Sequence, residues 1–387
     1  MDWCAMPLVL KNVLRNPGRS LLTTVSVAVS FCMLGVLMSM YRMFFLMPPD
    51  PDQALRLIVR NRISFTNPVP LSYQNRIASV RGVSQVMKYQ WFGGIYKDQR
   101  ESRNMFARFA VDPPTLFKVY PEYKISAGEQ QAFIRERQSC ILGRPLAQRL
   151  GVKVGDHITL VGDIFPATLD LVVRGFYDAK RYNEYLYFHF DYLNEAVFRG
   201  AQNFVSMYAV TVDSPESTGP VARSIDALFR NATNQTKTET EKSLQLSFLA
   251  YIGNVKLFLL ALCVSLTLAT LFVSANTMAM SVRERVPEIG ILKTLGFSDE
   301  FIVKLFVGES LAVALAGGAV GLFVAELIIA VLRHAPAIFV DLKALVLPAG
   351  LLAASLALAA VLGVISSAFP ALAASHRGIL DCLRVTD

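Results

Sequence analysis

The chain has 387 residues, of which 53% are hydrophobic and 18% charged, and its mean hydropathy is +0.41. This composition excludes an ordinary soluble enzyme and is typical of an integral membrane protein. The net charge of +8 does not indicate nucleic-acid binding, because the basic residues gather beside apolar stretches instead of forming one continuous basic face.

Four apolar stretches are each long enough to cross a bilayer, which takes roughly 20 apolar residues in a helix. The block between the first and second stretches has the composition of a soluble domain. We therefore expect an α-helical membrane protein of four transmembrane helices, with one large α+β extracytoplasmic domain inserted between helices 1 and 2. The predicted transmembrane helices are 20–46, 248–280, 301–332 and 345–372, and the domain with its stalk is 47–247.

Residues 1–19 precede the first span and carry an amphipathic pattern. Leu10 and Leu14 fall on one helical face and Lys11 and Arg15 on another. This pattern predicts a short helix lying in the inner membrane interface, with a solvated basic flank as the alternative.

The block 47–247 mixes strand and helix patterns. Alternating or β-branched runs predict strands, and helical spacing predicts helices at 144–150 and 221–229. The polar run 231–242 is expected to be a loop or the start of a stalk. Cys140 is the only cysteine of this block and is expected to be a buried small hydrophobe. The predicted strands are 55–59, 84–89, 106–111, 158–160, 169–173 and 208–212.

The segment 281–300, between the second and third spans, predicts a short helix from Pro287 to Leu295 that ends at Gly296. Ile289, Leu292 and Leu295 recur every third residue and are expected to share a face. Such a helix suits docking to a partner, and a plain surface loop is the alternative.

The third span carries the pattern Gly-Gly-x-x-Gly at Gly317, Gly318 and Gly321, which lets helices approach closely. A contact within the chain and a contact with a second copy both remain open. Glu309 and Glu326 are ionisable groups in an apolar span. Glu309 is expected to pair with Lys304 or Arg283, and Glu326 to make a packing or gating contact.

The flanking charges predict the orientation. Eight Lys and Arg residues lie in the N-terminal flank, the 281–300 segment and the tail 373–387, against two in the loop 333–344. This bias places both termini and the 281–300 segment in the cytoplasm. The domain 47–247 and the loop 333–344 then lie outside.

Catalytic motifs do not stand out. The chain has no Gly-x-x-x-x-Gly-Lys-Ser/Thr loop, no Gly-x-Ser-x-Gly elbow, and its four histidines are scattered. We therefore predict that it is not an enzyme and holds no metal or cofactor of its own.

Residues 283–298, read as Arg-x-Arg-x-x-Glu-Ile-Gly-Ile-Leu-Lys-Thr-Leu-Gly-Phe-Ser, resemble the signature of the MacB, LolC and FtsX superfamily of ABC transporter permeases. Segments 10–23, 146–160 and 369–384 resemble other parts of the same family, and Glu309 matches a recurrent acidic position. One departure is His376, where the family often has Arg or Lys.

The resemblance implies a permease of the bacterial cytoplasmic membrane that pairs with a second copy or a paralogue, with separate ATPase subunits that bind ATP and magnesium, and with a periplasmic adaptor. It implies export or extraction of substrate by mechanotransmission; the alternative is an FtsX-like protein that activates an envelope hydrolase without transport. The residues that it implies in coupling to the ATPase are Arg283, Arg285, Glu288, Ile289, Gly290, Leu292, Lys293, Leu295 and Gly296.

Overall fold

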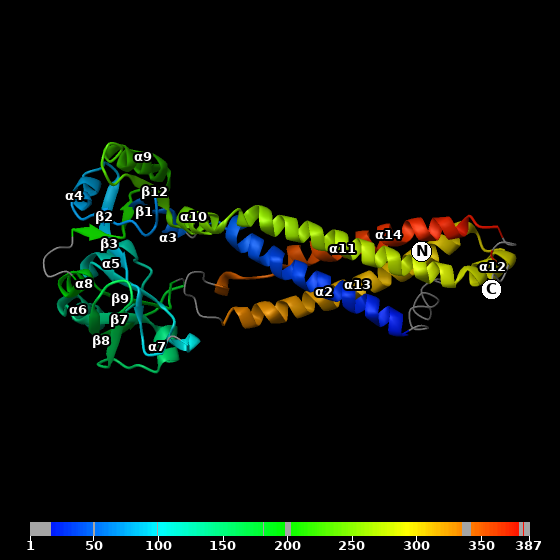
Figure 1. Ribbon diagram of the computed structural model, residues 1–387, viewed down its shortest axis with the longest axis horizontal. Coiled ribbons are helices and arrows are strands. Elements are labelled where there is room, and N and C mark those ends of the chain that lie inside the picture. Colours follow the sequence, from blue (N-terminus) through cyan, green and yellow to red (C-terminus); the bar gives the residue numbers. More distant parts are fainter. Residues whose placement is uncertain are drawn as a thin grey trace. The chain divides into compact units, whose positions relative to one another are not determined.

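The computed structural model describes residues 17–48, 51–98, 100–180, 182–197, 203–334, 342–378 and 382 (Figure 1). The chain divides into two compact units. We call them the helical unit, formed by Met1–Met47, Asn254–His334 and Lys343–Asp387, and the inserted domain, formed by Pro48–Gly253 and Ala335–Leu342. The interfacial helix predicted over 1–19 lies outside the described residues except at its end, where Pro17 already begins the first helix.

In the part of the helical unit that the structure describes, four helices are long and apolar enough to cross a membrane. The first, α2, continues through a five-residue π-helix, η1, and a shorter helix, α12, follows α11 directly. The bounds are α2 Pro17–Tyr41, η1 Arg42–Leu46, α11 Val255–Glu284, α12 Val286–Thr294, α13 Asp299–Leu332 and α14 Ala349–Ser375. The expected fold class, four such helices with one large α+β domain between the first and second, is confirmed.

The second span differs from the sequence prediction at its start. It was expected from residue 248, but α11 begins at Val255, and residues Glu241–Ile252 form a separate helix, α10, in the inserted domain. The apolar run continues across the break, so hydropathy alone does not reveal it. Gly253 has a φ of +136°, which L side chains rarely adopt. The Asn254 side chain then caps α11 by accepting a hydrogen bond from Leu257 N at 3.1 Å.

The inserted domain is built on a mixed ten-stranded sheet in the order β12-β1-β11-β3-β5-β9-β6-β8-β7-β4. The pairs β5–β9 and β6–β8 are parallel, and the other neighbours are antiparallel. The bounds are β1 Arg56–Asn61, β3 Val83–Trp91, β4 Gly94–Ile95, β5 Ala107–Val111, β6 Ser139–Gly143, β7 His157–Gly162, β8 Thr168–Tyr177, β9 Tyr185–His189, β11 Met207–Val212 and β12 Thr236–Thr240; β2 Val69–Pro70 pairs separately with β10 Phe204–Val205.

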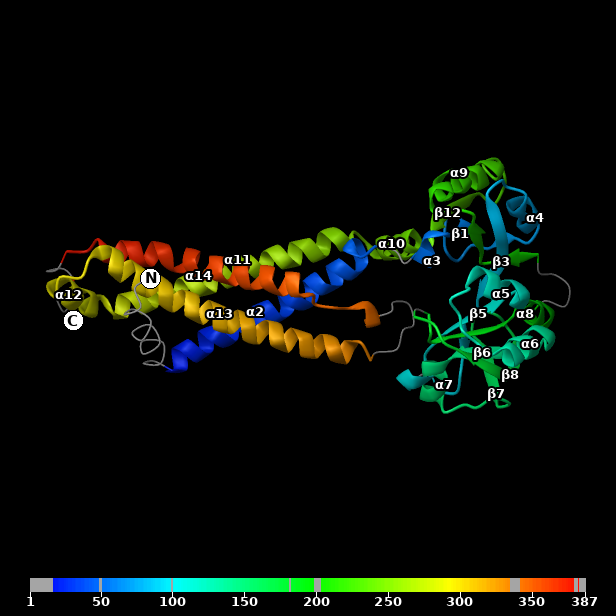
Figure 2. The same cartoon turned by 180° about the vertical axis from the view of Figure 1, so that it is seen from behind.

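Helices cover both faces of this sheet, which gives the domain two hydrophobic clusters. Along β1, Leu57 and Val59 join one cluster and Ile58 joins the other, because successive strand residues point to opposite faces. The first cluster draws on α4, α7, α8 and α9, and the second on α5 and α6 with Leu244 of α10. Figure 2 labels these helices around the sheet. The bounds are α3 Pro51–Ala54, α4 Tyr73–Ala78, α5 Pro113–Val119, α6 Ala127–Arg135, α7 Arg144–Leu150, α8 Phe190–Val197 and α9 Thr218–Leu228.

Each of the six predicted strands overlaps a strand of the sheet, and the helices predicted at 144–150 and 221–229 overlap α7 and α9. The run 231–242 was expected to be a loop or a stalk, but it contains β12. Its Thr-Lys-Thr-Glu-Thr segment has no apolar residue that would indicate a strand. It forms a strand because its backbone pairs with β1. Cys140 is fully buried as expected, and burial raises the pKa of its thiol well above the ordinary range.

Candidate functional site

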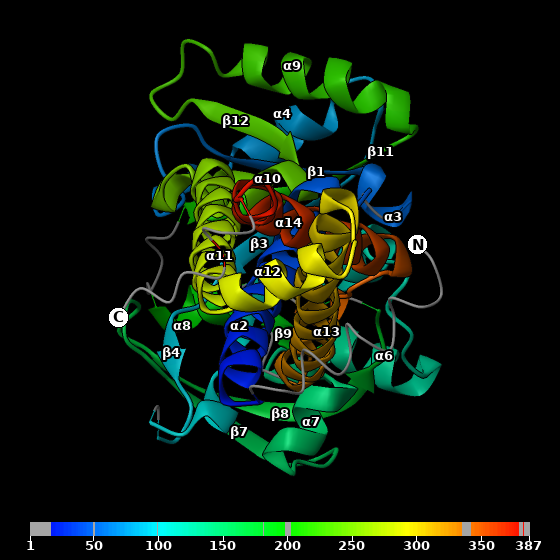
Figure 3. The same cartoon turned by 90° about the vertical axis from the view of Figure 1, so that its right-hand side faces the viewer.

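The short helix α12 crosses one end of the bundle formed by α2, α11, α13 and α14 (Figure 3). Pro287 occupies its first turn, where the missing N–H costs no hydrogen bond. Gly296 follows the helix with a φ of +88°, a conformation that favours glycine. Ser298 then caps α13, since its side chain accepts from Phe301 N at 3.3 Å. The predicted helix 287–295 is thus present, shifted by one residue.

The first end of α12 is attached to α13 through Arg285. Its Nη1 lies 2.6 Å from Oε2 of Glu309, and its Nε lies 3.0 Å from Oε2 of Glu288. Its guanidinium also lies 4.8 Å from the centre of the Phe306 ring. Burial by itself lowers the pKa of Arg285, but the hydrogen bonds with Glu309 and Glu288 outweigh it and leave that pKa raised. Arg285 therefore stays charged.

The partner of Glu309 was expected to be Lys304 or Arg283, and the structure assigns Arg285. Lys304 lies 2.6 Å from Glu300, one turn earlier on the exposed side of α13. Arg283 is exposed in the last turn of α11. The sequence shows that Arg285 stands directly before the proline-containing start of a short helix. Only the packing of α12 against α13 brings Arg285 to Glu309.

The second end of α12 is attached to α14 through Lys293. Its Nζ donates hydrogen bonds to the carbonyl of Ser375 and, at 2.9 Å, to that of Arg377. It also lies 2.9 Å from Oδ1 of Asp299. The last carbonyls of a helix have no partner within that helix, so Lys293 caps α14, which ends at Ser375.

Between these attachments α12 is packed through apolar side chains. Ile289 is buried, and Leu292 is partly buried, in a cluster shared by α11, α13 and α14. Gly290 is buried beside Ile289. Other buried members of this cluster are Met278, Val282, Ile302, Phe306, Ala371, Ala374 and Cys382.

Large apolar side chains are exposed on α12 and on the turn that follows it. Ile291 is 53% exposed, Leu295 70% and Phe297 41%, and the Phe297 ring stacks on Phe301 at 4.8 Å between centres. We call Ile291, Leu295 and Phe297 the exposed apolar set. Ile289, Leu292 and Leu295 do not share one face as expected. Steps of three residues drift by about 60° each on a 3.6-residue helix, and Leu295 lies beyond the helix end.

The glycines of α13 make contacts within the chain. A Cβ placed on Gly321 would lie 2.2 Å from Ala28 O, and one on Gly317 would lie 2.8 Å from Val27 Cβ, both in α2. A Cβ on Gly318 would meet Ala359 of α14 at 3.0 Å. Within this chain, these glycines bring α13 against α2 and α14, which is one of the two contacts that the sequence left open.

Glu326 lies near the other end of α13 and is half-exposed. Its Oε1 lies 3.0 Å from Nη2 of Arg333, and Arg333 Nε donates to Leu345 O at 2.7 Å. This arrangement ties the end of α13 to the segment before α14. It is a packing contact, one of the two roles that the sequence allowed.

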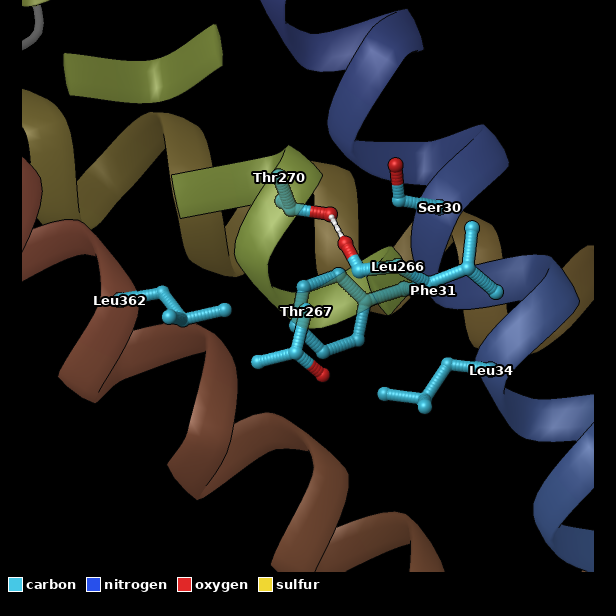
Figure 4. Close-up of a pocket in the computed structure, with 7 residues that line it drawn as sticks. All are labelled: Ser30, Phe31, Leu34, Leu266, Thr267, Thr270 and Leu362. Atoms are coloured by element: carbon cyan, nitrogen blue, oxygen red, sulfur yellow. Dashed lines mark hydrogen bonds between the residues drawn. The ribbon is translucent and has the colours of Figure 1, made fainter. Parts of the chain in front are cut away.

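A small indentation lies among α2, α11 and α14 (Figure 4). Its empty volume of about 170 Å³ includes space open to the surroundings, and it encloses no room for a water-sized molecule. Thr267 and Thr270 donate to carbonyls four residues earlier in their own helix, at 2.8 and 2.7 Å. These hydroxyls are satisfied within α11 and do not need a ligand. The lining residues are Ser30, Phe31, Leu34, Leu266, Thr267, Thr270 and Leu362.

Comparison with known proteins finds two families along the chain. Residues 20–228 match the MacB-like periplasmic core domain, and residues 257–379 match the FtsX-like permease C-terminal domain. An uncharacterised ABC transporter permease of Methanocaldococcus jannaschii is 28% identical over 322 residues, which cover 80% of this chain and 77% of that protein.

Solved structures also resemble part of the chain. The periplasmic region of MacB from Actinobacillus actinomycetemcomitans matches with a TM-score of 0.37 and 12% identity, over 50% of this chain and 92% of that one. The extracellular domain of the noncanonic ABC-type transporter YknZ from Gram-positive bacteria matches with a TM-score of 0.36 and 13% identity, over 48% of this chain and all of that one.

Proposed function

The chain belongs to the MacB/LolC/FtsX-type permeases of ABC transporters, and from this premise we propose that it couples a separate ATPase to movement of the inserted domain. Membership makes it a multi-pass membrane protein and a transporter subunit, and implies an ATPase partner. ATP and magnesium then bind to that partner. The work done outside the membrane is export or extraction of a substrate by mechanotransmission.

The observation that carries the proposal is the division of α12 into two sides. Arg285, which directly precedes α12, and Lys293 attach it to α13 and α14, whereas the side chains of the exposed apolar set are 41–70% exposed. Exposed apolar side chains grouped on a short helix and the turn that follows it are typical of a protein interface. We propose that the ATPase binds this set.

The two attachments support transmission of movement. Because α12 is bonded to α13 at one end and to α14 at the other, displacement of α12 by an ATPase displaces both helices. The glycines of α13 place it in direct backbone contact with α2, whose chain leads into the inserted domain. Close-packed contacts transmit displacement because they do not deform continuously.

The assembly proposed around this chain follows from charge and family. The Lys and Arg bias at the span ends supports cytoplasmic termini and a cytoplasmic α12, with the inserted domain on the far side of the cytoplasmic membrane. A second copy or a paralogue completes the permease, and a periplasmic adaptor contacts the inserted domain.

The test changes the exposed apolar set and leaves the attachments of α12 intact. Ile291→Asp with Leu295→Asp places charges in the proposed interface, so we expect loss of most co-purifying ATPase and of the ATPase stimulation that the permease provides. The measurement is affinity purification from native membranes followed by an ATPase assay.

The matched control is Val154→Asp with Ile164→Asp, which adds the same two charges at side chains that are 49% and 60% exposed in the inserted domain. It should retain the ATPase. Full retention of the ATPase by the α12 double variant, at normal expression, would show that α12 is not the docking site.

A further inference from the structure

The chain enters and leaves the inserted domain through neighbouring strands. The incoming chain passes through α3 into β1, and the outgoing chain passes from β12 directly into α10. Two residues then separate the end of α10 from the start of α11. β1 and β12 pair in antiparallel register, with Leu57 opposite Thr240. Both connections to the membrane helices therefore meet at one edge of the sheet.

A buried charged cluster joins these two connections. Arg56, the first residue of β1, is 2% exposed, and its Nη2 lies 2.8 Å from Oε1 of Glu122. Its Nε lies 3.2 Å from Oε1 of Glu241, the first residue of α10. Tyr120 donates its hydroxyl to the same Glu241 oxygen at 2.9 Å and lies under the guanidinium, 4.5 Å from ring centre to Cζ. We call Arg56, Tyr120, Glu122 and Glu241 the Arg56 cluster.

A second set of contacts holds the middle of α10. Ser247 donates to Oε2 of Glu239 in β12 at 2.7 Å, and Arg60 of β1 lies 2.8 Å from the other oxygen of Glu239. Burial by itself raises the pKa of Glu239, but hydrogen bonds from Lys237, Ser247 and Arg60 outweigh it and lower that pKa. α10 is thus attached at its first residue and again nearly two turns later.

The Arg56 cluster is not the arrangement that stability alone would favour. Buried ion pairs can often be replaced by apolar residues without loss of stability. In the described part of the chain, Oε2 of Glu241 is also buried without a hydrogen-bond partner. What the cluster does supply is a link between distant segments, because the guanidinium lies within ion-pair distance of Glu122, before α6, and of Glu241, in α10. Among the described residues, Nε of Arg56 is itself buried without a hydrogen bond.

We propose that Arg56 is a positioning residue that attaches α10 to β1, so that both membrane connections act on the inserted domain as one body. This inference rests on the proposed coupling function. Movement of α2 or α11 then reaches the sheet at the β1–β12 edge. Gly253, with a φ of +136°, separates α10 from α11. Because α10 is not a continuation of α11, its own contacts with β1 and β12 hold it against the sheet.

The test is hydrogen exchange with mass spectrometry on the permease purified with its ATPase, with and without ATP and vanadate. In Arg56→Met we expect peptides of α10 to exchange about ten-fold faster or more, since local opening then costs less free energy. Nucleotide should still protect α12, but the nucleotide-dependent change in β1 and β12 should be lost. Arg56→Lys keeps the cation and should restore part of that response.

The control is Arg144→Met, which removes an exposed arginine 2.9 Å from Asp178 in the same domain and should change neither exchange nor the response. Should Arg56→Met fail to fold, Glu241→Gln removes one charge at nearly constant shape and should loosen α10 in the same way.

Two results would overturn the inference: unchanged exchange of α10 in both variants, or a full nucleotide response of β1 and β12 while α10 is loosened. If α12 of the unsubstituted protein does not respond to nucleotide, the proposed function is wrong. The exchange of α10 without nucleotide still decides whether Arg56 holds this helix.

Discussion

The inserted domain and the helical unit bury different kinds of side chain. The domain buries large aromatic rings, including a tyrosine group in which the hydroxyls of Tyr123 and Tyr187 lie 2.9 Å apart, and it buries ionised clusters at its edge. The helical unit buries small residues at its helix contacts. Those of α13 and α14 include Gly308, Ala314, Gly317, Gly318, Gly321, Ser355, Ala359, Gly363, Ser366 and Ser367.

The difference reflects the two solvents. In water, each large apolar side chain removed from solvent contributes free energy in proportion to its area. Between helices in lipid, burial of apolar surface contributes little, and association depends on close approach and a few polar contacts. The two units should therefore respond differently to the same type of substitution.

The largest effect is expected from Phe188→Ala in the inserted domain. Phe188 is fully buried and meets the Phe92 ring edge-to-face at 5.8 Å, so its loss should destabilise the domain by about 3–5 kcal/mol. Chemical denaturation, monitored by hydrogen exchange of peptides from the domain, measures this loss of unfolding free energy. The same substitution at Phe369, 80% exposed on α14, should leave stability nearly unchanged, and equal losses at both sites would contradict the comparison.

A smaller effect is expected from Gly321→Ala in α13, which adds a methyl group to a close contact instead of removing a buried ring. The new methyl group meets Ala28 O, so α2 and α13 must separate, at a cost of about 1–3 kcal/mol. Thermal stability in detergent or nanodiscs measures it. Gly350→Ala adds the same group in α14 where no atom lies within 4 Å, and it should be neutral or slightly stabilising. A tolerated Gly321→Ala would mean that the glycine contact does not hold these helices.

The smallest effect concerns pH and the inserted domain alone. Burial lowers the pKa of His189, whose Nε2 lies 2.6 Å from Phe133 O. The unfolded chain then binds the proton more readily, so His189 contributes stability that is present above about pH 6.5 and is lost as pH falls, by about 1.4 kcal/mol per unit of pKa depression.

The free energy of unfolding of the domain, measured between pH 7.5 and pH 5.5, should show this loss. In His189→Gln this free energy should depend less steeply on pH. The stability of the helical unit over the same range gives the internal reference. An unchanged slope in the variant would assign the acid sensitivity to other groups.

The sequence by itself determined the four spans, the position of the inserted domain and the short helix after α11. Transmembrane helices can be predicted from sequence because a helix that crosses lipid must be apolar over its whole crossing length. The short helix is readable because Pro287 and Gly296 act locally on the backbone. Six of the twelve strands in the described part of the domain could be predicted for the same local reason, since alternating apolar residues have a period of two.

Only the tertiary structure decided which residues meet. β12 has a polar sequence and becomes a strand by pairing with β1. Arg285 binds Glu309 from 24 residues away, Lys293 caps a helix that ends more than eighty residues later, and Arg56 meets Glu241 from the far end of the domain. Such contacts depend on how distant segments pack, and no local pattern of side chains encodes their partners.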